Sequence, residues 1–228
     1  MTRLRVAIFD VDGTLVDSQR TIISCMDAAF RQMDLTVPPP ETIRRIVGLS
    51  LPVAIDRLAP EVPRSTQDRI VDAYKTAYAN QRIEEGIAGS PLYPGALKCL
   101  DRLGQDDHVL LAVATGKSRR GLNLLLGMHG LDGRFVSTQV ADDHPSKPNP
   151  SMVEAILRET GAEAAETVMI GDTSFDMEMG QAAGLRRLGV SWGYHSVDAL
   201  EAAGAEAMAH QFDEVVPLLE HFWEQAHV

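Results

Sequence analysis

Two aspartates separated by one residue form the strongest chemical signal in the chain. Asp10 and Asp12 follow the apolar segment Val6–Phe9 and precede Gly13. Because side chains alternate along an extended backbone, both carboxylates point to the same side and can reach one substrate. A calcium-binding loop would need a preceding helix and a glycine at its sixth position, whereas Gly13 is fourth and a strand pattern precedes it. An ordinary capped turn stays an open alternative.

A second segment places a hydroxyl, a glycine and a lysine at the end of another apolar run. Thr115 and Gly116 end this run, and a hydroxyl with the N–H groups of a following helix start suits phosphate oxygens. With Lys117 and Ser118 the string looks like the tail of a P-loop. That motif requires a glycine at position 111, which is leucine, so a nucleotide-kinase function loses its main support. A helix start followed by a solvated lysine is the alternative reading.

Two later segments supply another lysine and two more acids. Lys147 directly precedes Pro148 and lies near Pro150, whose rings restrict the backbone, so its amine can be held toward a phosphate or a carboxylate. Asp172 and Asp176 follow a further apolar run and are four residues apart. Carboxylates are ligands that Mg²⁺ takes together with substrate phosphate and water. Asp176 also suits the first turn of a helix, and the two roles are compatible.

The elements that must position these residues follow from the apolar pattern. Short runs rich in β-branched residues predict buried strands at 5–9, 109–114, 134–137, 167–170 and 185–190. Helical patterns lie between the later strands, at 118–128, 150–160 and 175–183. This alternation predicts a doubly wound, Rossmann-like parallel sheet, in which ligands bind outside the carboxyl ends of the strands. The Ala/Glu-rich stretch 199–209 predicts a surface helix with its flanks.

Residues 18–86 interrupt the alternation. They show helical patterns at 21–33, 41–46, 51–58 and 66–83, punctuated by prolines at 38–40 and 52. Glycines and prolines between 86 and 95 mark the return to the sheet. We therefore expect an α/β catalytic core made of residues 1–17 and 87–228. A small α-helical cap, residues 18–86, would be inserted after the first strand.

Composition limits the partners that the protein can have. The 228 residues, 45% of them hydrophobic, can bury a sizeable core. A formal net charge of -11 makes the average surface repel nucleic acid and anionic lipid, and the isolated arginine pairs form no basic patch. Cys25 and Cys99 have no zinc or redox spacing, and neither a signal peptide nor a membrane span is recognisable. We expect a cytoplasmic monomer or homodimer that binds neither nucleic acid nor membrane.

Together the four segments resemble the haloacid dehalogenase superfamily over essentially the whole chain. The matching motifs are, in chain order, Asp10-x-Asp12-Gly13-Thr14, Thr115, Lys147 and Gly171-Asp172-x-x-x-Asp176. The helical insert falls where that superfamily's small α-helical cap lies. The strings Asp12–Ser18 and Val190–Tyr194 look like the phosphoglycolate phosphatase branch.

The resemblance implies a phosphatase with a covalent intermediate. Asp10 would attack phosphorus and form an aspartyl-phosphate. Asp12 would protonate the leaving oxygen and then activate water. Thr115, Gly116 and Lys147 would bind phosphate oxygens. In this reading catalysis comes from positioning and charge stabilisation.

The resemblance also implies Mg²⁺ as the cofactor. Its ligands would be the carboxylates of Asp10 and Asp172 and the backbone carbonyl of Asp12, together with phosphate and water. Asp176 would lie outside this ligand set, where it would support the metal ligands or orient Lys147.

The substrate implied is a small phosphorylated metabolite, with 2-phosphoglycolate the leading candidate. Arg45, or its neighbour Arg44, could supply a cation for the glycolate carboxylate. Other small metabolites, namely a sugar phosphate, a nucleotide monophosphate or pyrophosphate, remain alternatives. A phosphomutase is disfavoured because Leu51 stands where a basic phosphate clamp is expected. A non-catalytic sensor is disfavoured because binding alone does not need Asp12.

Two other chemistries of the superfamily fit the sequence poorly. A dehalogenase lacks the second aspartate of the first motif, and here Asp12 is present. A phosphonatase needs a lysine in the cap that forms a Schiff base. Lys75 is the sole lysine of the predicted cap, and we expect it to be an ordinary surface residue.

Overall fold

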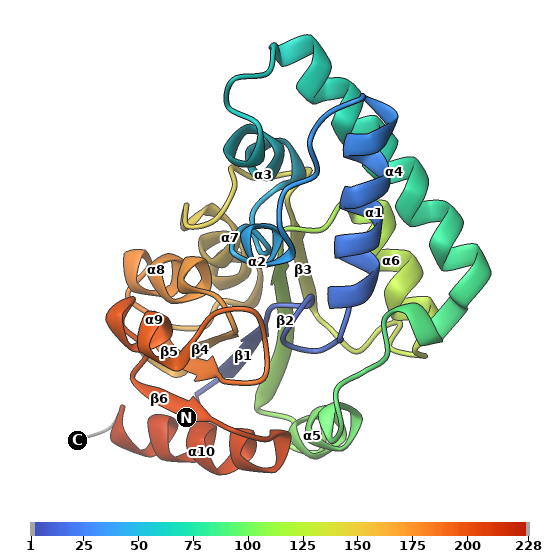
Figure 1. Cartoon of the computed structure of the whole chain (residues 1–228). Helices are drawn as coiled ribbons and strands as arrows, with labels where there is room; N and C mark the ends of the chain where they lie inside the picture. Colours follow the sequence, from blue (N-terminus) through green and yellow to red (C-terminus); the bar gives the residue numbers. More distant parts are fainter. Residues whose placement is uncertain (1–2, 227–228) are drawn as a thin grey trace.

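The computed structural model describes residues 3–226, and its centre is a six-stranded parallel sheet. The strands are β1 (Arg5–Phe9), β2 (Val109–Thr115), β3 (Ser137–Val140), β4 (Thr167–Gly171), β5 (Arg186–Val190) and β6 (Ala207–Ala209). Their order, β3-β2-β1-β4-β5-β6, places β1 between β2 and β4 (Figure 1). The winding changes direction at β1, and doubly wound sheets bind ligands at such a switch point. The predicted fold class is confirmed.

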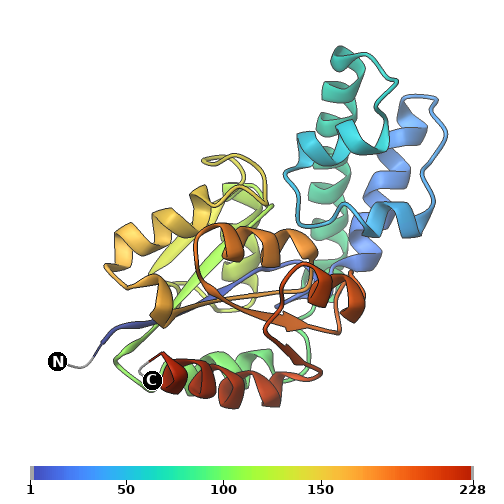
Figure 2. The ribbon, with the colours of Figure 1, turned by 90° about the vertical axis from the view of Figure 1, so that its left-hand side faces the viewer.

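Helices cover both faces of the sheet. Figure 2 shows α5 (Ala96–Leu103) and α10 (Val215–Gln225) on one face and α7 (Ser151–Thr160) and α8 (Ser174–Ala182) on the other. The remaining core helices are α6 (Arg119–Met128), α9 (Val197–Ala202) and the short 3-10 turns η2 (Ala164–Glu166) and η3 (Phe212–Glu214). Within residues 3–226, no helix combines the length and apolar character that crossing a membrane requires.

The central strand is buried on both sides, which explains its unbroken apolar run. Ala7 and Phe9 join one hydrophobic cluster together with residues of α5, α6 and α10. Val6 and Ile8 join a second cluster together with residues of α7 and α8. Alternate side chains of one strand thus anchor the two helical layers. The end of β1 is held in place from both faces.

Four helices between β1 and β2 pack around a hydrophobic cluster of their own. They are α1 (Gln19–Gln32), α2 (Pro40–Arg44), α3 (Leu51–Leu58) and α4 (Arg64–Glu85), followed by the 3-10 turn η1 (Gly86–Gly89). Phe30 and Ile70 are buried in this cluster, at 2% and 0% exposure. Figure 2 shows the four helices standing beside the sheet, away from its covering helices. The separate cluster supports a division into core and cap, which stays our proposal.

Two segments differ from the sequence-based expectation. The strand predicted at 134–137 lies at Ser137–Val140, because Phe135 enters the core from a loop and the polar residues after it form the ladder with β2. The stretch predicted as a surface helix with flanks contains α9 and then the three-residue strand β6. That strand pairs with β5 alone. Short edge strands contain few apolar residues in a regular pattern, so the sequence indicates neither β3 nor β6 clearly.

Candidate active site

Three buried carboxylates meet where β1 and β4 end. Phe9 of β1 pairs with Ile170 of β4, so the residues that follow these strands are neighbours. Oxygen atoms of Asp10, Asp172 and Asp176 lie within 4.8 Å of one another. Asp176 comes from the first turn of α8, where its Oδ2 accepts hydrogen bonds from the N–H and hydroxyl of Thr173 at 3.1 and 2.7 Å. The structure therefore brings these three predicted site residues together.

Lys147 contributes a positive charge to this cluster. Its Nζ lies 3.1 Å from Asp10 Oδ1 and donates a hydrogen bond to Asp176 Oδ1 at 2.6 Å. The side chain has no exposed surface, although it comes from the loop between β3 and α7. Burial alone would lower the pKa of Lys147, but the neighbouring carboxylates of Asp10 and Asp176 raise it above its ordinary value. The ammonium is therefore held charged at neutral pH.

One ammonium does not neutralise three carboxylates. Burial raises the pKa of Asp10 to about 7, and Asp176 adds to this while Lys147 works against it. Burial also raises the pKa of Asp172 well above its usual range, with further contributions from Asp10 and Asp176. An additional cation would relieve the excess negative charge.

The cluster fits a hard divalent cation. Neither carboxylate oxygen of Asp10 accepts a hydrogen bond within residues 3–226, although both are buried. Asp172 is fixed by the hydroxyl of Thr14 at 2.7 Å and the backbone N–H of Tyr194 at 2.9 Å. A Cβ at Gly13 or at position 193 would collide with the Asp172 side chain. Preorganised carboxylate oxygens in a cluster with excess negative charge are what Mg²⁺ binding requires.

Asp12 points away from that cluster and forms an ion pair with Lys117. Lys117 Nζ donates to the two carboxylate oxygens of Asp12 at 2.9 and 2.8 Å, and the hydroxyl of Ser18 donates to Oδ1 at 2.6 Å. The same ammonium donates to the hydroxyl of Tyr78 on α4 at 3.2 Å. The expected alternative of a solvated lysine at position 117 is wrong, because its side chain is 8% exposed.

Thr115 and Gly116 stand where the core meets the helical insert. Thr115 is buried at the end of β2, and its hydroxyl accepts a hydrogen bond from the backbone N–H of Lys117 at 3.3 Å. A Cβ at Gly116 would come within 2.6 Å of the carbonyl oxygens of Gly48 and Leu49. The glycine thus allows the backbone of the insert to lie directly against the core.

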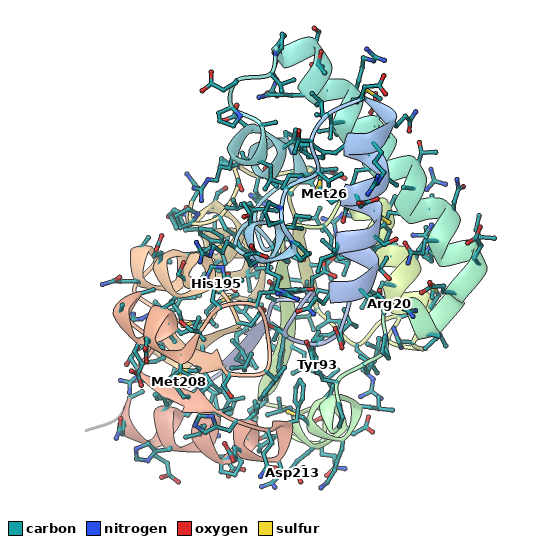
Figure 3. All side chains as sticks on the ribbon, viewed as in Figure 1. Arg20, Met26, Tyr93, His195, Met208 and Asp213 are labelled. Atoms are coloured by element: carbon teal, nitrogen blue, oxygen red, sulfur yellow. The ribbon has the colours of Figure 1, made fainter. Side chains whose placement is uncertain are left out.

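A cavity of about 360 Å³ lies between the core and the helical insert. Its core wall includes Asp10, Asp12 and Thr115, and its other wall includes apolar and aromatic residues of α1 and α4. Met26 is one of these, and Figure 3 shows it on α1. Asp10 therefore faces a cavity that a small organic phosphate can enter, whereas Lys147 contacts Asp10 and is not part of the lining.

The structure does not bring Arg45 to this cavity. Arg45 is exposed and absent from the cavity lining, because the following residues Ile46 and Val47 turn inward instead. Lys75, expected to be an ordinary surface residue, is exposed but lines the cavity. Arg82 lines it as well. Lys75 and Arg82 both belong to α4. This helix is far from the motifs in sequence, so the sequence does not indicate that these residues lie near the site.

Comparison with known proteins places the chain among hydrolases. The model of a family described as haloacid dehalogenase-like hydrolase matches residues 7–190. A probable phosphatase, IndB, from Dickeya dadantii is 35% identical over 214 residues, 92% of this chain and 91% of that protein. A phosphoglycolate phosphatase from Pectobacterium atrosepticum is 27% identical, with coverages of 97% and 94%. A solved hydrolase from Pseudomonas syringae, 23% identical, shares the fold with a TM-score of 0.84 and coverages of 95% and 98%.

From the burial of these carboxylates we predict that the free energy of unfolding of the metal-free wild type differs from that of Asp10→Asn by an amount that depends on pH. Because the folded pKa of Asp10 is raised to about 7 from 3.8, the folded state retains a proton that the unfolded chain loses. Wild-type stability should therefore fall, relative to Asp10→Asn, as the pH rises from about 4 to about 7, by roughly a few kcal/mol. Urea unfolding in chelator measures this. Asp132→Asn, at an exposed position, is the control. A constant difference across this range contradicts the prediction.

Proposed function

Because the chain belongs to the haloacid dehalogenase-like hydrolase family and is a phosphatase, we propose that it hydrolyses a small phosphomonoester with Mg²⁺ through an aspartyl-phosphate on Asp10. One observation carries this proposal. The Asp10 carboxylate is buried, accepts no hydrogen bond within residues 3–226 and lines the cavity. Its neighbour Asp12 lines the same cavity. A nucleophile and an acid-base group thus face the same cavity.

In the first step an oxygen of Asp10 forms a bond to phosphorus while the bond from phosphorus to the leaving oxygen breaks. Asp12 gives its proton to that oxygen, which leaves as an alcohol. This requires Asp12 to turn from Lys117 toward the leaving group. Lys147 orients Asp10 through an ion pair, in which Lys147 Nζ lies 3.1 Å from Asp10 Oδ1.

In the second step a water molecule attacks the phosphorus of the aspartyl-phosphate. Asp12 takes a proton from the water, the bond between Asp10 and phosphorus breaks, and inorganic phosphate leaves. The ion pair of Asp12 with Lys117 at 2.8 Å suits the carboxylate that this step needs. Thr115 lines the cavity beside Asp10 and is suited to bind a phosphate oxygen.

The carboxylates of Asp10 and Asp172 and the backbone carbonyl of Asp12 would hold Mg²⁺. When bound, the ion supplies charge neutralisation for the phosphate and for the attacking carboxylate. Both oxygens of Asp176 are already engaged, one by Lys147 and one by Thr173. A supporting role outside the ligand set therefore suits Asp176.

The first substrate candidate is 2-phosphoglycolate. Several relatives carry the name phosphoglycolate phosphatase, among them the Pectobacterium protein at 27% identity. Lys117 lines the cavity and contacts Asp12, which supports a contact between its ammonium and a carboxylate on a short leaving group. It takes the part first expected of Arg45. A sugar phosphate, a nucleotide monophosphate or pyrophosphate remains the alternative.

Asp10→Asn tests the nucleophile. An amide has the size of the carboxylate but cannot attack phosphorus, so turnover of an aryl phosphate should fall below about 1% of wild type. Circular dichroism checks that the variant is folded. Asp17→Asn, at an exposed position of the same segment, is the matched control and should keep wild-type turnover. Substantial turnover by Asp10→Asn would rule out the covalent mechanism.

Removal of divalent metal tests the role of the acidic cluster. We expect turnover to stop in chelator, to return with added Mg²⁺, and to be inhibited by Ca²⁺. Calcium takes more ligands at longer distances, which would misplace Asp10 relative to phosphorus. Initial rates with an aryl phosphate measure all three effects. Equal rates with and without chelator would refute the metal proposal.

The substrate candidate is tested by comparing kcat/KM for 2-phosphoglycolate with that for ethyl phosphate, which has a similar size and no carboxylate. A cation at the leaving-group site should favour the glycolate ester by about tenfold or more. Equal values would remove phosphoglycolate as the candidate while leaving the phosphatase mechanism in place.

A further inference from the structure

Three cations line the cavity without a partner. They are Lys75 and Arg82 of α4 and Arg120 of α6. Within residues 3–226 their side chains form neither a hydrogen bond nor an ion pair. The other charged groups of the lining are engaged, as in the pair of Asp12 with Lys117. Among the described residues, the cavity lining therefore holds three cations without an ion pair and one such carboxylate, Asp142, although the whole chain has a formal net charge of -11.

The helical spacing on α4 places two of these cations on the cavity side. Lys75 and Arg82 are seven residues apart, and the cavity-lining Tyr78 lies between them on the same face. Arg82 also borders a second, small cavity together with Gly121 of α6. It therefore lies close to the first turn of α6, which contains Arg120.

The start of α6 is already capped, because the backbone N–H of Arg119 donates to Asp142 Oδ2 at 2.8 Å and that of Gly121 donates to the Ser118 hydroxyl at 3.1 Å. The helix has ten residues, and its first turn contains no acidic residue. Asp142 and Asp143 thus supply the anions that the partial positive charge of this helix N-terminus favours, and the guanidinium of Arg120 is the charge there that can still meet a ligand. Arg119 is compensated by Asp143 at 2.8 Å, whereas Arg120 has no such partner.

The size and lining of the cavity leave room for a leaving group longer than glycolate. Its volume of about 360 Å³ falls within the range of roughly 300–1,000 Å³ that holds drug-sized ligands. Apolar side chains of the insert, including Ile22, Met26 and Leu51, line part of the wall. They suit carbon atoms between the phosphate and a distal charged group.

We propose that the cavity also takes leaving groups longer than glycolate that end in an anion, which Arg82 and Arg120 bind, while 2-phosphoglycolate is a shorter ester for the same site. This inference rests on the proposed phosphatase function of the same cavity. The anion is a carboxylate or a second phosphate, both of which match the planar guanidinium fork. A phosphomonoester with a distal anion therefore reaches from Asp10 to the first turn of α6.

A matched chain-length series tests the proposal. The substrates are ω-phosphonooxy alkanoates of two to about eight carbons and alkyl phosphates of the same lengths, with alkanediol bisphosphates as a third arm. We expect the kcat/KM ratio of the anionic to the neutral ester to peak above two carbons, at about tenfold or more over the two-carbon value. The third arm shows whether carboxylate or phosphate is preferred.

Variants assign the effect to the two arginines. Arg82→Gln and Arg120→Gln should each lower the peak ratio by roughly tenfold, mainly through KM of the anionic ester. Arg82→Lys should lower it less, because it keeps the charge. Arg69→Gln is the matched control, since Arg69 is exposed on α4 and does not line the cavity.

Two outcomes separate this inference from the proposed function. Hydrolysis of alkyl phosphates with no gain from a terminal anion at any length, or a gain unaffected by both glutamine variants, overturns the inference alone. If none of these esters nor an aryl phosphate is hydrolysed in the presence of Mg²⁺, the proposed function fails and the inference fails with it.

Discussion

The contact of the Lys147 ammonium with Asp10 and Asp176 is the interaction on which the rest of the site depends. A lysine without exposed surface is costly to bury, and it is tolerated because two carboxylates lie at 3.1 and 2.6 Å. The same contacts make it possible to hold Asp10 and Asp176 away from water beside Asp172. Since three carboxylates still outnumber one ammonium, the cluster keeps an excess of negative charge that suits a divalent cation.

The two carboxylates that we propose as nucleophile and acid-base group have different electrostatic surroundings. Asp10 faces the buried acidic cluster and Lys147, whereas Asp12 faces Lys117 and Ser18. They are two residues apart in the chain, yet their neighbours come from different strand ends and from the helical insert. Different surroundings for adjacent acids are what a nucleophile and an acid-base group require.

Contacts between the insert and the core connect the surroundings of Asp12 with the walls of the cavity that a substrate would enter. Tyr78 on α4 accepts a hydrogen bond from Lys117, the lysine that pairs with Asp12. Close backbone approach at Gly116 brings residues 48 and 49 against the end of β2. The insert therefore contributes a polar contact to the catalytic side and also the apolar and cationic walls of the cavity. Under our proposals, α4 would therefore take part both in selecting the leaving group and in positioning Asp12.

The doubly wound sheet and the strand ends that carry Asp10, Thr115 and Asp172 could be predicted from the sequence, because buried parallel strands leave continuous apolar runs followed by polar residues. The sequence also indicated Lys147 and Asp176 through their place in a known motif pattern. The three-dimensional structure was needed to show that Lys117 is a buried partner of Asp12 and that Arg45 faces solvent. It likewise brought Arg82 and Arg120 to one cavity. The apolar periodicity of a segment indicates which of its residues are buried. Which side chains of two packed elements face each other depends instead on how the elements pack, and the local sequence does not show this.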